Sequence, residues 1–204
     1  MNIFTSWINP LDEGITEFFK NYIESESFTE WMTIFSCFFI FYFVIAAMFL
    51  IKKENRWVGI LMLITLIVTY LLNDLVFKNI FERSRPFVDL GLATSPGFHI
   101  DGYSFPSGHS AITSAGSFSF FFYYLLIDKR KTKSYLGYSI IFFIIMLLVM
   151  FSRIALLHHY FTDCLAGLVE GAIVSIIVIL IYKGITSYLN KKRELTLEKT
   201  NKEN

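Results

Sequence analysis

Five side chains in this sequence could act on an anionic group. They are the cations and imidazoles of Lys78, Arg85, His109, Arg153 and His159. Arginine presents a planar fork of N–H donors and lysine a compact positive charge, and both suit the oxygens of a phosphate group. Ionisable residues next to long apolar segments are also costly and usually functional. This set of residue types therefore indicates an anion site, most simply a site for phosphate.

The stretch Phe105-Pro-Ser-Gly-His109 stands directly before a long uncharged segment. A helix that begins here leaves its first backbone N–H groups free, and such groups bind anions. Gly108 lets a ligand approach the backbone closely, and Ser107 adds a hydroxyl group. The stretch predicts a phosphate cradle at a helix N-terminus. A plain helix cap beside an interfacial histidine is the alternative.

His159 and Asp163 are four residues apart, so on a helix they share one face. A carboxylate that accepts a hydrogen bond from one ring nitrogen leaves the other nitrogen free to act as a nucleophile or a base. The spacing predicts such a pair, with an incidental surface pair as the alternative. Lys78 and Arg85 alone would be ordinary anchors at the end of a membrane span.

Long apolar segments must position these residues. Only 17% of the residues are charged and 54% are hydrophobic. The uncharged segments of the chain are long enough, as helices, to cross the hydrocarbon core of a membrane. They also lack the polar stripe of a soluble helix. We expect an all-α integral membrane protein, with 1–204 forming a single domain and a helical bundle of five spans at about 31–51, 57–77, 110–127, 135–151 and 161–182.

Two further segments flank this bundle. Apolar residues at helical spacing in 10–24 predict an amphipathic helix that lies at the membrane interface, with Asp12 on a face away from the apolar one. The polar tail 190–204 is expected to fray. The net charge of +1 gives no reason to expect nucleic-acid binding, and the two cysteines suggest neither a disulfide framework nor a metal site.

The distribution of basic residues predicts an orientation. With five spans, 13 of the 18 Lys and Arg residues fall on the side of the C-terminus. The positive-inside rule places that side in the cytoplasm. We therefore expect a multi-pass protein of the cell membrane, with its N-terminus and the 78–109 loop outside.

Together, three motifs resemble the signature of the type 2 phosphatidic acid phosphatase superfamily, which includes membrane lipid phosphatases and vanadate-dependent haloperoxidases. They are Lys78-x6-Arg85-Pro86, Pro106-Ser-Gly-His109 and Ser152-Arg153-x5-His159-x3-Asp163. The short chain and the His158-His159-Tyr160 run look most like the small bacterial undecaprenyl pyrophosphate phosphatases of that superfamily. Phe161 stands where many members have proline.

The resemblance implies a role for each matching residue. His159 would attack phosphorus, Asp163 would orient it, and His109 would protonate the leaving oxygen. The phosphate oxygens would be held by Lys78, Arg85, Ser107, Gly108 and Arg153, with Ser152 supporting Arg153 or the phosphate. Fixed cations would take the place of a metal ion, so we expect no metal and no cofactor. Arg83 would touch a second phosphate or anchor its loop.

The expected partners are a lipid phosphate substrate and the surrounding membrane lipids, with no obligate protein partner. Undecaprenyl diphosphate is the favoured substrate. Phosphatidylglycerophosphate, phosphatidic acid and lipid A phosphate are alternatives, as is transfer of the phosphoryl group to another lipid. A non-enzymatic transporter or channel is the alternative from another class. It is disfavoured because only Glu170 lies deep within a span.

Overall fold

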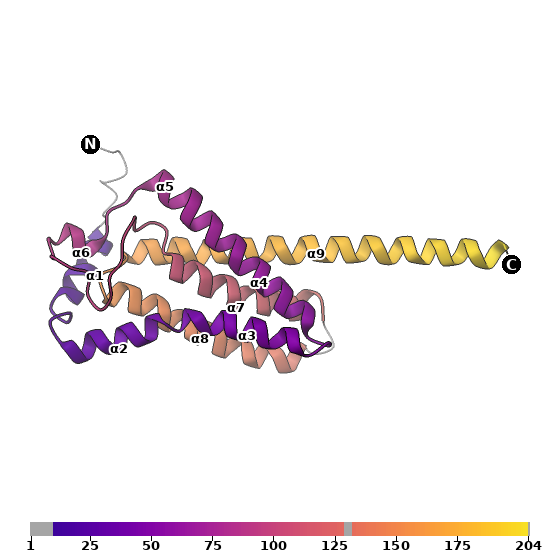
Figure 1. Cartoon of the computed structure of the whole chain (residues 1–204), viewed down its shortest axis with the longest axis horizontal. Helices are drawn as coiled ribbons and strands as arrows, with labels where there is room; N and C mark the ends of the chain where they lie inside the picture. The colour runs from indigo at the N-terminus through magenta and orange to yellow at the C-terminus, as the bar shows by residue number, and fades with distance from the viewer. Residues whose placement is uncertain (1–9, 129–131, 204) are drawn as a thin grey trace.

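The structure is a computed structural model, and it describes residues 10–128 and 132–203 (Figure 1). Every regular element in these residues is a helix. In chain order they are α1 (Pro10–Lys20), α2 (Glu26–Ser36), α3 (Phe39–Ile51), α4 (Arg56–Leu71), the π-helix η1 (Leu72–Phe77), α5 (Lys78–Phe81), α6 (Pro86–Asp89), α7 (Gly108–Leu126), α8 (Thr132–Ala155) and α9 (Phe161–Glu203). The expectation of an all-helical chain is therefore confirmed over the described residues.

Within the described residues, four helical stretches are long and apolar enough to cross a membrane. They are Glu26–Ile51, Arg56–Asp89, Tyr135–Ala155 and Phe161–Asn201. The protein is therefore a multi-pass membrane protein, but the expected count of five spans is not confirmed. The segment that falls short is α7, in which serine and threonine side chains such as Ser110, Thr113, Ser114 and Ser117 interrupt the apolar run.

The polar character of α7 follows from its place at the centre of the bundle. It packs against α4, α8 and α9, and twelve of its 19 residues are buried. Two glycines of α9 allow its backbone to approach the backbone of α7 closely. A Cβ added at Gly167 would lie 3.0 Å from the backbone nitrogen of Ala111, and a Cβ added at Gly171 would lie 2.6 Å from the backbone nitrogen of Ala115. The Ser175 hydroxyl then donates to the Ala115 carbonyl at 2.9 Å. α7 is thus fixed from several sides, which holds its N-terminus in one place.

The outer helices present apolar side chains to their surroundings. Ile140, Ile144 and Leu147 of α8 are exposed, as are Ile177 and Ile181 of α9. Exposed apolar rows of this kind are costly in water and suit a lipid environment. α4 crosses α9 obliquely and rises toward α5 at the end of the bundle that carries the loops (Figure 1).

The N-terminal helix α1 does more than rest on the bundle surface. Asp12 was expected on a face away from the apolar one, and in the structure it is fully buried. It accepts hydrogen bonds from Arg83 Nη2 at 2.8 Å, from the Thr162 hydroxyl at 2.6 Å and from the Thr162 backbone N–H at 3.0 Å. The two bonds from Thr162 tie α1 to the first turn of α9, and the third ties it to Arg83 in the loop between α5 and α6.

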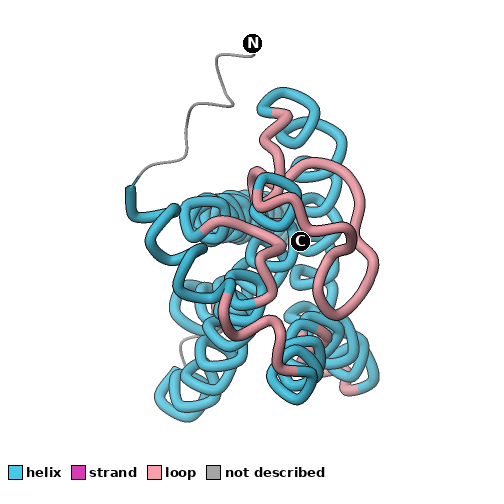
Figure 2. The backbone as a smooth tube through the Cα atoms, turned by 90° about the vertical axis from the view of Figure 1, so that its left-hand side faces the viewer, coloured by secondary structure: helices cyan, strands magenta, loops and turns pink. Residues whose placement is uncertain are grey.

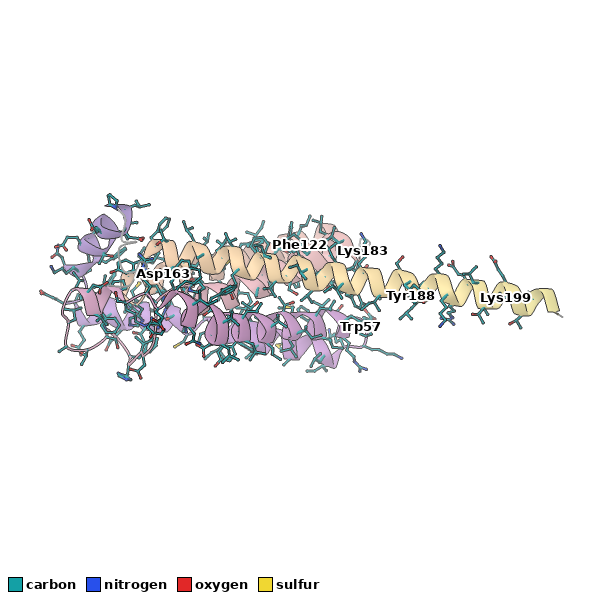
Figure 3. The ribbon with its side chains drawn as sticks, turned by 90° about the horizontal axis from the view of Figure 1, so that it is seen from above. Trp57, Phe122, Asp163, Lys183, Tyr188 and Lys199 are labelled. Atoms are coloured by element: carbon teal, nitrogen blue, oxygen red, sulfur yellow. The ribbon has the colours of Figure 1, made fainter. Side chains whose placement is uncertain are left out.

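The C-terminal tail also differs from the expectation of fraying. α9 continues as one helix to Glu203, well beyond the other helices (Figures 1 and 3). In Figure 3, Asp163 lies at the bundle end of α9, while Tyr188 and Lys199 lie on the projecting part. The residues after 190 are rich in Lys, Glu and Leu and contain neither Gly nor Pro, which favours helix over coil.

Candidate active site

The predicted site residues lie in or next to the loops and at the starts of α7 and α9, and the loops gather at the end of the bundle that faces the viewer in Figure 2. The backbone N–H of Ser107 donates to the carbonyl of Asp163 at 3.0 Å, which joins the start of α7 to the start of α9. His159 lies in the short connection between α8 and α9, two residues after Leu157, whose φ is +56°. A sharp turn there brings the histidine back over the bundle.

His159 is oriented by a backbone group. Its Nδ1 lies 2.7 Å from the carbonyl oxygen of Ser104. Because a carbonyl only accepts, Nδ1 carries the proton and Nε2 is unprotonated. Nε2 accepts a hydrogen bond from Arg85 Nη1 at 3.3 Å. The geometry therefore holds the unprotonated nitrogen of His159 against a fixed positive charge.

Asp163 holds this histidine less directly than the i, i+4 spacing predicts. Its Oδ2 is 3.8 Å from His159 Nδ1, which is too long for a hydrogen bond. The carboxylate instead accepts from the Ser104 hydroxyl and from the Tyr160 backbone N–H at 2.8 Å. The expected direct pair is thus replaced by Ser104, whose carbonyl contacts His159 while its hydroxyl contacts Asp163. The backbone curls before α9 begins, so the two side chains do not stand on one regular helical face.

Arg83 anchors the loop and makes no contact that suggests a second phosphate site. Its Nη1 donates to Asp163 Oδ1 at 2.5 Å and to the Thr162 hydroxyl at 2.8 Å, and its Nη2 donates to Asp12. The guanidinium also lies 4.1 Å from the ring centroid of Tyr160. Two buried carboxylates therefore compensate the charge of Arg83.

Arg85 holds the loop between α6 and α7, residues 90–107, by hydrogen bonds to its backbone. It donates to the backbone carbonyls of Asp101 at 3.0 Å, Gly102 at 2.9 Å and Tyr103 at 3.0 Å, and to that of His158 at 2.9 Å. No carboxylate is among these partners, so the guanidinium keeps its full positive charge beside His159 Nε2. It is 3% exposed, which places that charge in a poorly solvated position.

Arg153 is fully buried and only partly satisfied. Its Nη1 donates to the Ser36 hydroxyl at 2.7 Å, and its guanidinium carbon lies 5.1 Å from the ring centroid of Phe98. Nε and Nη2 have no hydrogen-bond partner among the described residues. Unpaired buried donors on a cation are costly. They are therefore well suited to hold the oxygens of an anion.

The other predicted phosphate ligands lie around these two arginines. Lys78 Nζ forms an ion pair with Asp74 at 2.8 Å, one turn earlier. Ser107 is the N-cap residue of α7, and its hydroxyl accepts from Ser110 at 3.0 Å. A Cβ added at Gly108 would lie 3.2 Å from Asn73 Oδ1, so a side chain there would crowd that amide.

Two expected residues do not face the reacting centre. The Ser152 hydroxyl donates to the Val149 carbonyl of its own helix at 2.7 Å, so it supports neither Arg153 nor a phosphate by donation. His158, the neighbour of His159 in the chain, is fully buried. Its Nε2 lies 2.7 Å from the Pro96 carbonyl, and its ring packs against Phe98 with centroids 5.0 Å apart. His158 therefore holds the loop between α6 and α7 through these two contacts.

The electrostatics favour neutral imidazoles. Burial lowers the pKa of His159 well below its ordinary 6.5, and the guanidinium groups of Arg85 and Arg153 lower it further. Burial and the same charge of Arg153 lower the pKa of His109, whose ring packs edge-on against Phe39 with centroids 4.6 Å apart. Burial lowers the pKa of His158 to about 2. A neutral His159 keeps Nε2 unprotonated, as a nucleophile requires.

Sequence reasoning missed three residues of this site. Ser104 and Ser36 act through contacts with segments far away in the chain, and Asp12 acts from an amphipathic helix. Arg83 gave a signal, because a second arginine stands two residues before Arg85, but the spacing could not separate their roles. The described residues contain no group of three or more His, Cys, Asp or Glu side chains that could hold a metal ion.

An apolar groove of about 530 Å³ begins directly beside the site. Phe105 and Pro106, which precede the predicted phosphate cradle, line its upper part together with Phe81, and the far end reaches Ile177 of α9. A second hollow of about 480 Å³ lies between α4 and α9, and the two share Leu72, Val174 and Ile177. The surfaces together form a lateral path from the site along the apolar helices.

One end of this membrane bundle combines buried cations, an unprotonated imidazole nitrogen and a lateral apolar groove. These features are those of the membrane lipid phosphatases. The comparisons with known proteins agree. The family model of the PAP2 superfamily matches residues 57–187, so the chain belongs to that superfamily. It is 33% identical over 153 residues to phosphatidylglycerophosphatase B of Bacillus subtilis (strain 168), covering 73% of this chain and 67% of that protein.

A solved structure supports the same assignment. The chain is similar to the crystal structure of a transmembrane PAP2-type phosphatidylglycerolphosphate phosphatase from Bacillus subtilis, with a TM-score of 0.68 and 25% identity. The match covers 90% of this chain and 92% of that one. The all-helical membrane fold and the enzyme class are thereby confirmed: the chain is a lipid phosphatase of the PAP2 superfamily.

Proposed function

We propose that this lipid phosphatase hydrolyses the terminal phosphate of phosphatidylglycerophosphate through a phosphohistidine on His159. The observation that carries the proposal is the unprotonated Nε2 of His159, which accepts a hydrogen bond from the buried guanidinium of Arg85, near the apolar groove that Phe105 and Pro106 line. The names of the two similar proteins from Bacillus subtilis support the choice of substrate. Undecaprenyl diphosphate, which the sequence favoured, becomes the second candidate.

In the first step, His159 Nε2 attacks phosphorus and the bond between phosphorus and the lipid oxygen breaks. Arg85 and Arg153 stabilise the charge that spreads over the phosphate oxygens, with Lys78 and the backbone N–H groups at Gly108 adding to them. His109 gives its proton to the departing lipid oxygen. Its pKa is low in the empty site, so a dianionic phosphate that binds nearby must raise this pKa before the ring can act as an acid.

In the second step, water attacks the phosphohistidine. His109, now neutral, takes a proton from this water, the P–N bond breaks, and inorganic phosphate leaves. Asp163 acts through Ser104, which keeps the ring of His159 in one orientation. Ser152 has no part in either step. Fixed cations supply the positive charge, so the reaction proceeds without a metal ion.

The groove between α4 and α9 holds the apolar part of the lipid. It opens sideways toward the membrane, so a lipid can enter without leaving the bilayer. The two hollows form one continuous path, and this feature favours the single long chain of a prenyl diphosphate as the second candidate. We place the site on the outer face of the cell membrane and the projecting part of α9 in the cytoplasm, on the charge count of the sequence.

The test is phosphate release by the purified protein in detergent micelles, with EDTA present throughout. The panel contains phosphatidylglycerophosphate, phosphatidic acid and undecaprenyl diphosphate, and kcat/KM is measured for each. We expect the highest kcat/KM for phosphatidylglycerophosphate and the same rates with and without EDTA. A higher value for undecaprenyl diphosphate would establish the second candidate instead. Loss of activity in EDTA that magnesium restores would refute the metal-free reaction.

The fate of the phosphoryl group separates hydrolysis from transfer. Labelled phosphatidylglycerophosphate is incubated with an excess of an unlabelled lipid alcohol. We expect all of the label to appear as inorganic phosphate. Label in the lipid fraction would show a phosphotransferase.

A further inference from the structure

The short helix α1 has three different faces, and it lies at the end of the bundle that carries the loops (Figure 1). One face packs on the bundle with the buried residues Asp12, Thr16 and Phe19. A second face is acidic and exposed, with Glu13 and Glu17 one turn apart. The third carries Leu11 and Phe18, which are two turns apart and 55% and 57% exposed. An acidic face suits water, whereas an exposed apolar face indicates a further partner for α1 besides the bundle.

The exposed apolar face of α1 continues into the lipid-facing surface of the bundle. The ring centroid of Phe18 lies 5.1 Å from that of Tyr22, which is 46% exposed, and 5.1 Å from that of Phe19. Phe19 in turn packs edge-on against Phe151 of α8 with centroids 5.6 Å apart, and Phe151 is 44% exposed. Aromatic side chains are typical of membrane–water interfaces. We call Leu11, Phe18 and Tyr22 the outer stripe. Its continuity with α8 identifies the lipid of the membrane interface as its partner.

The buried face of α1 reaches the reacting centre through a chain of contacts. Asp12 accepts from Arg83 Nη2 at 2.8 Å, and Arg83 Nη1 donates to Asp163 at 2.5 Å. Asp163 accepts from the Ser104 hydroxyl, and the Ser104 carbonyl accepts from His159 Nδ1 at 2.7 Å. Each of these side chains is 5% exposed or less. In such a poorly solvated network two carboxylates share one guanidinium, so a shift of Asp12 changes how strongly Arg83 attracts Asp163.

Helix α1 depends on the contacts of both apolar faces, because helices as short as its 11 residues are marginal on their own. It also lies outside the residues 57–187 that the family model matches. We propose that α1 binds the lipid of the membrane interface through the outer stripe, and that this contact holds Asp12 in place as a positioning residue for His159. The proposal rests on the proposed function for the role of His159 as the nucleophile. Loss of the lipid contact lets Asp12 move away from Arg83. Arg83 then draws Asp163 away from Ser104, and the ring of His159 is less firmly oriented.

The first experiment tests the partner of the outer stripe. Phe18→Trp and Glu17→Trp are each placed in nanodiscs of phosphatidylethanolamine and phosphatidylglycerol, with or without bromine on the acyl chains. Brominated chains quench tryptophan emission on contact, and the emission of the three native tryptophans is subtracted with wild type. We expect quenching in Phe18→Trp and none in the matched control Glu17→Trp, which alters the acidic face. Emission of Phe18→Trp that bromine leaves unchanged would overturn the proposal, and would indicate a second copy of this chain or another protein as the partner.

The second experiment tests the coupling of the outer stripe to His159. kcat and KM for p-nitrophenyl phosphate, a soluble ester that needs no lipid contact, are measured in nanodiscs without bromine. We expect Phe18→Asp and Leu11→Asp each to lower kcat about tenfold with little change in KM, since a misplacement of about 1 Å can cost about 10²-fold. Phe18→Leu keeps the apolar contact and Glu17→Ala alters only the acidic face, so both should keep the kcat of wild type.

The double variant Asp12→Asn/Phe18→Asp decides whether the two residues act along one path. Because the lipid contact acts through Asp12, Phe18→Asp should add nothing to the loss of kcat that Asp12→Asn causes. Additive losses, or the kcat of wild type in both Phe18→Asp and Leu11→Asp, would overturn the proposal. A wild type that forms no phosphohistidine would instead refute the proposed function, and the quenching experiment would still decide whether the outer stripe binds lipid.

Discussion

Replacement of Asp12 by alanine tests whether α1 is a part of the folded protein. The side chain of Asp12 is fully buried and accepts three hydrogen bonds, one from Arg83 and two from Thr162. Alanine would leave the Arg83 Nη2 group and the Thr162 backbone N–H buried without these acceptors. Removal of one partner of a buried ion pair costs about 3–5 kcal/mol.

The loss should fall at the lower end of that range. Arg83 keeps its second carboxylate, Asp163, at 2.5 Å, so its charge is not left alone. We therefore expect the free energy of unfolding to fall by about 3 kcal/mol. For a chain of about 200 residues, each kcal/mol shifts the unfolding midpoint by about 2–4 °C. The expected fall in the midpoint is thus about 6–12 °C.

The assay is thermal unfolding in detergent, with Glu13→Ala as the matched control because Glu13 is exposed on the same helix. Asp12→Asn should fall between the two, since it keeps an oxygen for the Thr162 N–H but loses the charge. We expect turnover to fall as well, because Arg83 would then form its ion pair with Asp163 alone and attract that carboxylate more strongly. If Asp12→Ala unfolds within about 1 °C of Glu13→Ala, α1 does not contribute to the fold and this reasoning is wrong.

Four further predictions follow from the site. His159→Ala should abolish the acid-labile phosphoenzyme in rapid-quench trapping, whereas His109→Ala should still form it from substrates with good leaving groups; the reverse pattern would exchange their roles. Arg153→Met should raise the unfolding midpoint while it abolishes turnover, since a buried cation with two unpartnered N–H groups is replaced by an apolar chain; a lower midpoint would contradict this. Because the folded pKa of His158, about 2, is below the unfolded 6.5, stability is lost as pH falls below 6.5, by about 2–3 kcal/mol at about pH 4.5. Unfolding of His158→Gln should be less pH-dependent than that of wild type. A cysteine placed in 90–100 should label from outside the cell, and labelling only after lysis would reverse the orientation.

The sequence predicted the apolar helices because their signal is local. Each span is a run of apolar residues, and the order of the three motifs along the chain was enough to indicate the family. Interruptions within the runs were not predictable. The first expected span is divided into α2 and α3 by a turn at Cys37 and Phe38, and the second ends in the π-helix η1. Such irregularities arise from packing between helices. The sequence of one helix alone does not show how its neighbours pack against it.

The site was predictable in its residue types but not in its hydrogen bonds. The spacing of His159 and Asp163 suggested a direct bond, because it assumed a regular helix over both residues. The helix begins only at Phe161, so the contact passes through Ser104 instead. A loop carbonyl leaves no trace in the sequence, since every residue has one.

The two neighbouring arginines show how the fold divides one charge pattern into two roles. Arg83 is compensated by Asp12 and Asp163, so it adds no net positive charge to the site. Arg85 and Arg153 have no carboxylate within ion-pair distance among the described residues, so their charges are unbalanced until an anion binds. Burial of two such cations costs stability in the empty protein. If these arginines bind phosphate as proposed, we expect the anion to recover that cost, most strongly in the transition state, where the negative charge on the equatorial oxygens is greatest. Acidic partners placed on Arg83 alone therefore strengthen the fold without weakening the site's affinity for phosphate.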